Sequence, residues 1–148
     1  MRVEPQGSQL HYDRSHLAAV CRELGLRLLV LYGSRATGTP PPTPDSDLDL
    51  AVAGAHCSRE RFMTWYRTLS DVFTAYDVDL ALLSEADPLF RYEIFRQGLL
   101  LYGDVDDFLA YKAYAYRDFV DSADLRRLEE ALFHKKLAFI REALHATP

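Results

Sequence analysis

The chain has 148 residues, 49% of them hydrophobic, and a formal net charge of −5 with a sequence pI near 5.5. This length and composition predict one compact domain with an apolar core and leave too little chain for a second full domain. The acidic balance argues against an extended nucleic-acid surface, because phosphate contacts need clustered Lys and Arg. No secretory leader opens the chain and no apolar run approaches a membrane span, so we expect a cytoplasmic protein.

Cysteine and histidine usage indicates no separate site. Cys21 and Cys57 show neither CxxC nor metal-ligand spacing, so we expect two free thiols in a reducing compartment. The five histidines are scattered along the chain, and we expect them to be surface or packing residues.

The first elements follow from hydrophobic periodicity. Residues 1–10 are polar and predict a loose start. Apolar residues then recur at helical spacing and predict a helix from Asp13 or Ser15 to Leu24. The apolar run over residues 26–32 predicts a buried strand, because it is short and stops at Gly33. A proline-filled loop over residues 40–44 then excludes regular structure.

Two aspartates alternate at the start of the next apolar run. Residues 47–53 predict a strand, in which side chains two positions apart share a face, so Asp47 and Asp49 should project together. Two like charges held this close are tolerated more readily when a cation lies between them. Oxygen ligands with few nitrogen or sulfur neighbours suit Mg²⁺, so this stretch predicts a metal site.

A Gly-Ser pair ends the strand that precedes the loop. Gly33 allows close approach of the backbone, Ser34 offers a hydroxyl, and Arg35 begins a predicted helical turn with free N–H groups. These features suit a phosphate chain, with Arg35 as either a phosphate contact or a solvated arginine. Alone, a Gly-Ser turn or two aspartates on an edge strand are more often structural, but their order along the chain indicates a metal–nucleotide site.

These residues carry a family resemblance. Gly33-Ser34, the SDLDL run at residues 46–50 and a later aspartate on a strand resemble the nucleotidyltransferase domain of the DNA polymerase β superfamily. In particular the chain resembles the minimal nucleotidyltransferases that serve as antitoxins to HEPN-domain toxins, over nearly its whole length. Twelve residues separate Ser34 from Asp47, more than is usual in the family, and the extra length falls in the proline loop.

The resemblance implies an α/β (α+β) fold, with a small mixed sheet backed by helices and a helical tail. It also implies two Mg²⁺ ions and ATP as the substrate. The third metal ligand is expected on a strand over residues 76–83, where Asp79 is preferred and Asp77 competes with it. The implied catalytic and metal-binding residues are Asp47, Asp49 and Asp79, and the nucleotide-binding residues are Gly33, Ser34 and Arg35.

The molecule that accepts the nucleotidyl group is indicated only by the resemblance. It implies transfer of AMP to a tyrosine hydroxyl of a cognate HEPN toxin, an RNase, with this chain acting as the antitoxin. A small-molecule nucleotidyltransferase of the aminoglycoside-modifying kind is one alternative, although such enzymes usually have a larger second domain. The other is a non-catalytic module that silences its partner by occlusion.

The second half predicts helices around one more strand. A helix is expected from the Ser58 cap to about Phe73, with Phe62, Trp65, Tyr66 and Leu69 in its apolar stripe. Further expected elements are a helix from Asp87-Pro88 to Gly98, an edge strand over 99–102, a helix from Asp106 or Asp107, and a last helix over about 123–144.

We therefore divide the chain into a nucleotidyltransferase core, residues 1–103, and a helical tail, residues 104–148, packed on the core or on a partner. The tail region is rich in tyrosine, for which packing, docking of a partner helix and self-modification all stay open. These tyrosines are Tyr102, Tyr111, Tyr114 and Tyr116.

Overall fold

The computed structural model describes residues 10–146, so the predicted loose start lies outside the described residues except for Leu10. Within the described range, no helix is both long and apolar enough to cross a membrane. The elements are α1 (Arg14–Glu23), β1 (Leu26–Tyr32), α2 (Ser34–Thr37), β2 (Leu48–Gly54), α3 (Arg59–Val72), β3 (Val78–Leu82), α4 (Pro88–Gln97), β4 (Leu99–Gly103), α5 (Val105–Asp121) and α6 (Ala123–His145).

The four strands form one mixed sheet in the order β3-β2-β1-β4. β1 runs antiparallel to both β2 and β4, while β2 and β3 are parallel. The parallel pair is joined by the crossover helix α3, since parallel neighbours cannot be connected by a tight turn. The structure thus confirms the predicted small mixed sheet, including the edge position of the strand after Gly98.

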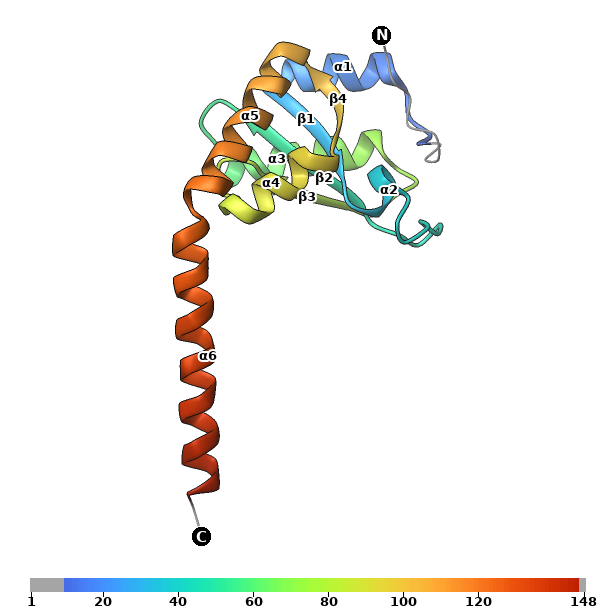
Figure 1. The fold of residues 1–148 in the computed structure, drawn as a ribbon. Coiled ribbons are helices and arrows are strands. Elements are labelled where there is room, and N and C mark those ends of the chain that lie inside the picture. The colour runs from blue at the N-terminus through green and yellow to red at the C-terminus, as the bar shows by residue number, and fades with distance from the viewer. Residues whose placement is uncertain (1–9, 147–148) are drawn as a thin grey trace.

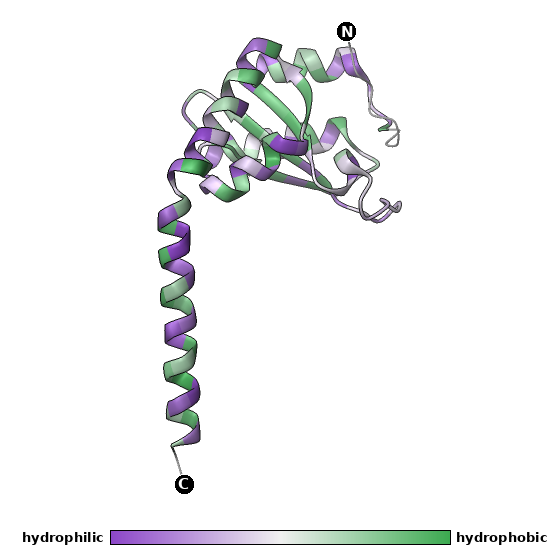
Figure 2. Ribbon diagram, viewed as in Figure 1, coloured by the Kyte–Doolittle hydropathy of each residue, from purple (hydrophilic) through white to green (hydrophobic). Residues whose placement is uncertain are grey.

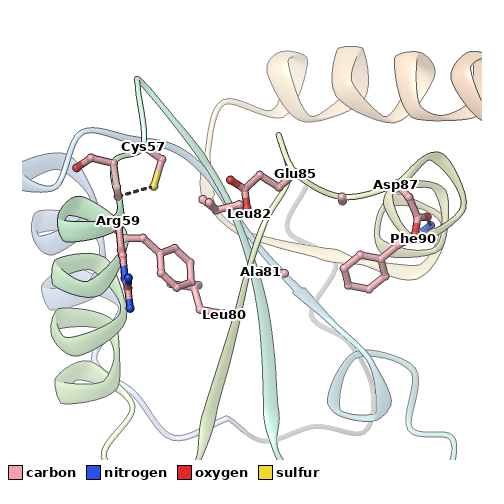
Figure 3. Close-up of a pocket in the computed structure, with 11 residues that line it drawn as sticks. Cys57, Arg59, Leu80, Ala81, Leu82, Glu85, Asp87 and Phe90 are labelled. Atoms are coloured by element: carbon pink, nitrogen blue, oxygen red, sulfur yellow. Dashed lines mark hydrogen bonds between the residues drawn. The ribbon is translucent and has the colours of Figure 1, made fainter.

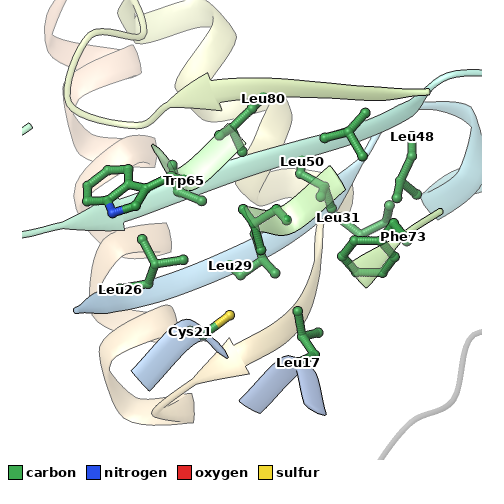
Figure 4. Packing of buried hydrophobic residues seen from close by; sticks show 13 residues of the cluster. Leu17, Cys21, Leu26, Leu29, Leu31, Leu48, Leu50, Trp65, Phe73 and Leu80 are labelled. Carbon is green, nitrogen blue, oxygen red and sulfur yellow. The ribbon is translucent and has the colours of Figure 1, made fainter. Parts of the chain in front are cut away.

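Helices cover both faces of the sheet (Figure 1). On one face, α1 and α3 bury a cluster in which Cys21 and Trp65 pack against Leu29 and Leu50 (Figure 4). On the other face, α4 and α5 contribute Phe95 and other apolar side chains to a second, smaller cluster. Side chains alternate between the two faces along each strand, so the position of a strand residue fixes which cluster it joins.

Side-chain caps fix the helix starts. Asp13, Ser58 and Asp87 each accept a hydrogen bond from a backbone N–H three residues later, as the sequence predicts for Ser58 and Asp87. The start predicted for α5, at Asp106 or Asp107, was two or three residues late, because Asp104 caps this helix by accepting from the Asp106 N–H at 2.7 Å. Tyr66 was also wrongly assigned to the apolar stripe of α3, since its side chain is exposed.

The last two helices differ in their packing. α5 lies along α4 and buries Ala115 against the sheet, whereas α6 extends away from the folded core (Figure 1). Within the described part of the chain, no residue of α6 is buried. Hydrophobic and hydrophilic residues are interspersed along its whole length (Figure 2). The division of the chain after residue 103 stays a prediction.

Candidate active site

The carboxylates gather where β2 and β3 begin. Asp49 pairs in register with Asp79 across the parallel strands, so the two side chains lie on the same face of the sheet. Leu48 and Leu50, on either side of Asp49, are buried in the α1 and α3 cluster, which directs Asp49 to the opposite face. The predicted start of this strand at Asp47 was one residue early, because β2 begins at Leu48 and Asp47 immediately precedes it.

The charge environment of Asp49 distinguishes the two candidates on the next strand. Burial, then the charge of Asp79, then that of Asp47, raises the pKa of the Asp49 carboxyl. Asp77 lies before the start of β3, and its backbone carbonyl accepts from the Leu48 N–H at 2.8 Å. This arrangement supports Asp79 over Asp77 as the third ligand, an assignment that stays a prediction.

Gly33 brings the backbone against Asp49. A Cβ atom on Gly33 would lie 2.2 Å from Asp49 Oδ2, and the residue has φ +75° and ψ −159°. That backbone region is essentially restricted to glycine. The contact arises because Tyr32, the preceding residue, pairs with Asp49 across the antiparallel strands β1 and β2. The turn after β1 is thereby held against the carboxylates.

Tyr32 is a site neighbour that the sequence analysis missed. Burial raises the pKa of its phenol to about 12, and the charges of Asp49 and Asp79 contribute to the increase. Its ring also packs edge-on against Phe90, with 5.6 Å between the ring centroids. As the last residue of an apolar run, Tyr32 carried no signal beyond that of a strand residue.

Arg35 holds the proline loop. Its Nε and Nη2 donate to the Ser46 carbonyl at 3.1 and 2.7 Å, and Nη2 also donates to the Thr43 carbonyl at 3.0 Å. The guanidinium lies 4.6 Å from the centroid of the Tyr76 ring, and only 8% of the residue is exposed. Arg35 is thus not a solvated arginine, whereas its contact with a phosphate stays a prediction. We therefore assign it to positioning the segment that leads into Asp47.

Hydrogen bonds between nearby residues close the proline loop. The Thr43 N–H donates to Ser46 Oγ at 2.8 Å, and the Ser46 N–H donates back to the Thr43 carbonyl at 3.0 Å. Ahead of it, α2 begins at the half-buried Ser34 and ends at Thr37, and the N–H of the following Gly38 donates to the Ser34 carbonyl at 2.7 Å. The predicted helical turn is present, while nucleotide binding by Gly33 and Ser34 stays a prediction.

The donor set fits a hard cation in its chemistry. Asp47, Asp49 and Asp79 supply only oxygens, and mutual repulsion between them would be relieved by a positive charge. Over residues 10–146, no three acidic, His or Cys side chains are already close enough to hold a metal ion. Asp47 and Asp79 are exposed, so their carboxylates are accessible to an ion from solvent.

A separate hollow lies along β3, between α3 and α4 (Figure 3). Its lining includes Phe62, Leu80 and Phe90, together with the polar side chains of Arg59 and Glu85. None of the three carboxylates lines it, so we do not assign it to the chemistry.

Sequence comparison identifies the family. The family described as Polymerase beta, Nucleotidyltransferase matches residues 17–107, which is well over half of the chain. The chain belongs to this nucleotidyltransferase family. The match spans all four strands and the start of α5, so it contains every predicted site residue. The protein is accordingly a nucleotidyltransferase with the polymerase β-like fold.

Solved structures share this fold. A toxin–antitoxin structure with AMP-PNP is 21% identical, with a TM-score of 0.58, and the match covers 89% of this chain and 98% of that one. A structure of a tri-AMPylated Shewanella oneidensis HEPN toxin in complex with an MNT antitoxin gives 19% identity, a TM-score of 0.54, and 88% and 95% coverage. A structure of the toxin–antitoxin MntA-HepT is 19% identical, with a TM-score of 0.53, and the match covers 88% of this chain and 96% of that one. No curated protein sequence matches this chain.

Proposed function

We propose that this protein transfers AMP from ATP to a tyrosine hydroxyl of a HEPN-domain RNase toxin and thereby acts as its cytoplasmic antitoxin. The observation that carries the proposal is the register of Asp49 with Asp79, beside the close approach of Gly33. The family membership supports nucleotidyl transfer, and the AMPylated toxin in a structure of the same fold supports a protein acceptor.

Each site residue has a separate part in this scheme. Asp47, Asp49 and Asp79 would hold Mg²⁺, and Gly33 and Ser34 would lie against the triphosphate. The absence of a Cβ on Gly33 leaves room for the Asp49 carboxylate beside them. When bound, Mg²⁺ would neutralise the phosphate charge and lower the pKa of the acceptor hydroxyl.

The chemistry is a single displacement. The acceptor oxygen forms a bond to the α-phosphorus, the bond from that phosphorus to the bridging oxygen breaks, and pyrophosphate leaves. A carboxylate oxygen of Asp79 takes the proton of the acceptor. The chain contributes positioning and charge placement, so removal of one carboxylate should slow transfer by orders of magnitude.

The test is the intact mass of a co-expressed HEPN-domain protein after incubation with this protein, ATP and Mg²⁺. We expect mass gains in whole adenylyl units with the wild type and none with Asp47→Asn. Asp45→Asn, two residues away in the same loop and likewise on an exposed side chain, is the matched control and should retain transfer. A partner that stays unmodified yet is neutralised by both wild type and Asp47→Asn would replace the proposal with silencing by occlusion.

A further inference from the structure

Helix α6 exposes large apolar side chains along its whole length. Its 23 residues make it about 35 Å long, and among the described residues its main packing against the rest of the chain is with α5. Helices in proteins draw most of their stability from a packed apolar face, which α6 lacks in the single chain. The exposed fractions are Leu125 57%, Leu128 54%, Leu132 56%, Phe133 58%, Phe139 72% and Ile140 42%.

These side chains share one half of the helix. At about 100° per residue, all six fall within one half-turn of the circumference, a face wider than a two-stranded coiled-coil seam. An exposed apolar face of this extent marks an interaction surface. Two charged residues, Glu129 and Lys136, lie in the middle of the face, and both are exposed.

The positions of these two charges indicate which partner packs against this face of α6. The midpoint between Glu129 and Lys136 falls between Leu132 and Phe133, close to the centre of α6. When two copies of α6 lie antiparallel about that midpoint, Glu129 of each copy meets Lys136 of the other. Parallel copies would instead oppose each charge with its own kind, which is unfavourable in a desolvated interface.

Four of the six apolar residues obey the same symmetry. Leu125 and Ile140 are equidistant from the midpoint, so an antiparallel copy places them opposite each other, and Leu132 then meets Phe133. Leu125 with Ile140 and Leu132 with Phe133 therefore form apolar pairs outside and between the two charge pairs, while Phe139 lies opposite Arg126. A polar pair at one level of such a face fixes the register in which two helices pack.

We infer that α6 is a self-association surface that pairs with α6 of a second copy in an antiparallel arrangement. Pairing would bury the exposed leucines and phenylalanines, and it would give α6 the packed face that the single chain does not supply. This inference rests on the faces of α6 and is independent of the proposed transfer reaction.

The test is the mass of the full chain in solution, measured by light scattering over a range of concentrations. We expect a dimer for the wild type. Glu129→Lys and Lys136→Glu should each weaken it by more than about tenfold, because each places like charges opposite one another. An equimolar mixture of the two variants should restore a dimer, since the reversed charges are then complementary.

Arg127→Glu is the matched control, because Arg127 lies on the opposite side of α6 and its charge change equals that of Lys136→Glu. It should dimerise as the wild type does. A wild-type chain that stays monomeric throughout would overturn the inference and leave the face to a different protein. A dimer that withstands Glu129→Lys, or variants whose mixture stays monomeric, would overturn the antiparallel pairing.

Discussion

Gly33 and Asp49 approach so closely that no side chain fits between them: a Cβ atom on Gly33 would lie 2.2 Å from Asp49 Oδ2. The same carboxylate is in register with Asp79 on the neighbouring strand. The turn after β1 and the acidic ends of β2 and β3 are therefore one structural unit. A change at Gly33 should act on the carboxylates directly.

We expect Gly33→Ala to reduce transfer by at least about a hundredfold, because the new methyl group displaces Asp49 from its position. The backbone adds a cost of about 1–3 kcal/mol, since φ +75° with ψ −159° is unfavourable for alanine. Gly38→Ala is the control: Gly38 has φ +74° but nothing within 4 Å of its Cβ position. It should lose only about 1 kcal/mol of stability and keep its activity. Equal losses of activity in the two variants would contradict the account.

Asp49→Asn should stabilise the protein in the presence of a chelator at neutral pH. Burial and the charges of Asp79 and Asp47 raise the pKa of Asp49, so the fold disfavours its ionised form. The stability contributed by this group is intact below the ordinary carboxyl pKa, about 3.9, and is lost as the pH rises through the raised value. The gain in Tm should therefore be largest near neutral pH and vanish toward about pH 4. A Tm difference that does not depend on pH would contradict this cause.

Mg²⁺ should raise the Tm of the wild type, since a ligand that binds only the folded state stabilises it. Asp49→Asn removes a predicted ligand, so the same Mg²⁺ titration should leave its Tm nearly unchanged. Asp45→Asn, outside the carboxylate cluster, should respond as the wild type does. Equal Mg²⁺ responses in all three proteins would argue against a metal site at β2 and β3.

Arg35→Lys should destabilise the protein by about 2 kcal/mol and loosen the proline loop, because a lysine cannot reproduce the bonds to the Ser46 and Thr43 carbonyls. Limited proteolysis should then cut the loop over residues 39–46 faster than in the wild type. Arg61→Lys, which changes an exposed arginine near Trp65, is the control and should leave the cleavage rate unchanged. An unchanged cleavage rate in Arg35→Lys would contradict the positioning role assigned to Arg35.

The two thiols should differ in reactivity. Burial raises the pKa of Cys21 to about 12, and its side chain has no exposure, whereas Cys57 is exposed. A thiol reagent should label one cysteine in the native protein and two after unfolding. Cys57→Ser should abolish native labelling, and rapid labelling of that variant would show that Cys21 is not protected in solution.

Local patterns predicted most of the fold. The run over residues 26–32 is short, apolar and ended by Gly33, and it forms β1 with those bounds. Ser58 and Asp87 predicted helix starts because a cap bonds within its own turn. The start of α5 was misplaced because several aspartates compete there, and only the structure shows that Asp104 is the cap.

Features that depend on distant contacts were less predictable. The alternation of Asp47 and Asp49 is local, but the placement of Tyr32 beside Asp49 depends on the pairing and register of β1 and β2. The bonds of Arg35 depend on how the proline loop folds back. The apolar periodicity of α6 is the same whether its face is buried in the chain or left exposed, so the sequence alone did not separate those outcomes.

The most direct test of the central claim is the transfer of label from ATP to the HEPN-domain partner, with the label at either the α- or the γ-phosphate. Nucleotidyl transfer at the Asp47, Asp49 and Asp79 cluster predicts label on the partner from the α-phosphate alone, and none with Asp49→Asn. Label from the γ-phosphate, or α-label that persists in Asp49→Asn, would contradict the account.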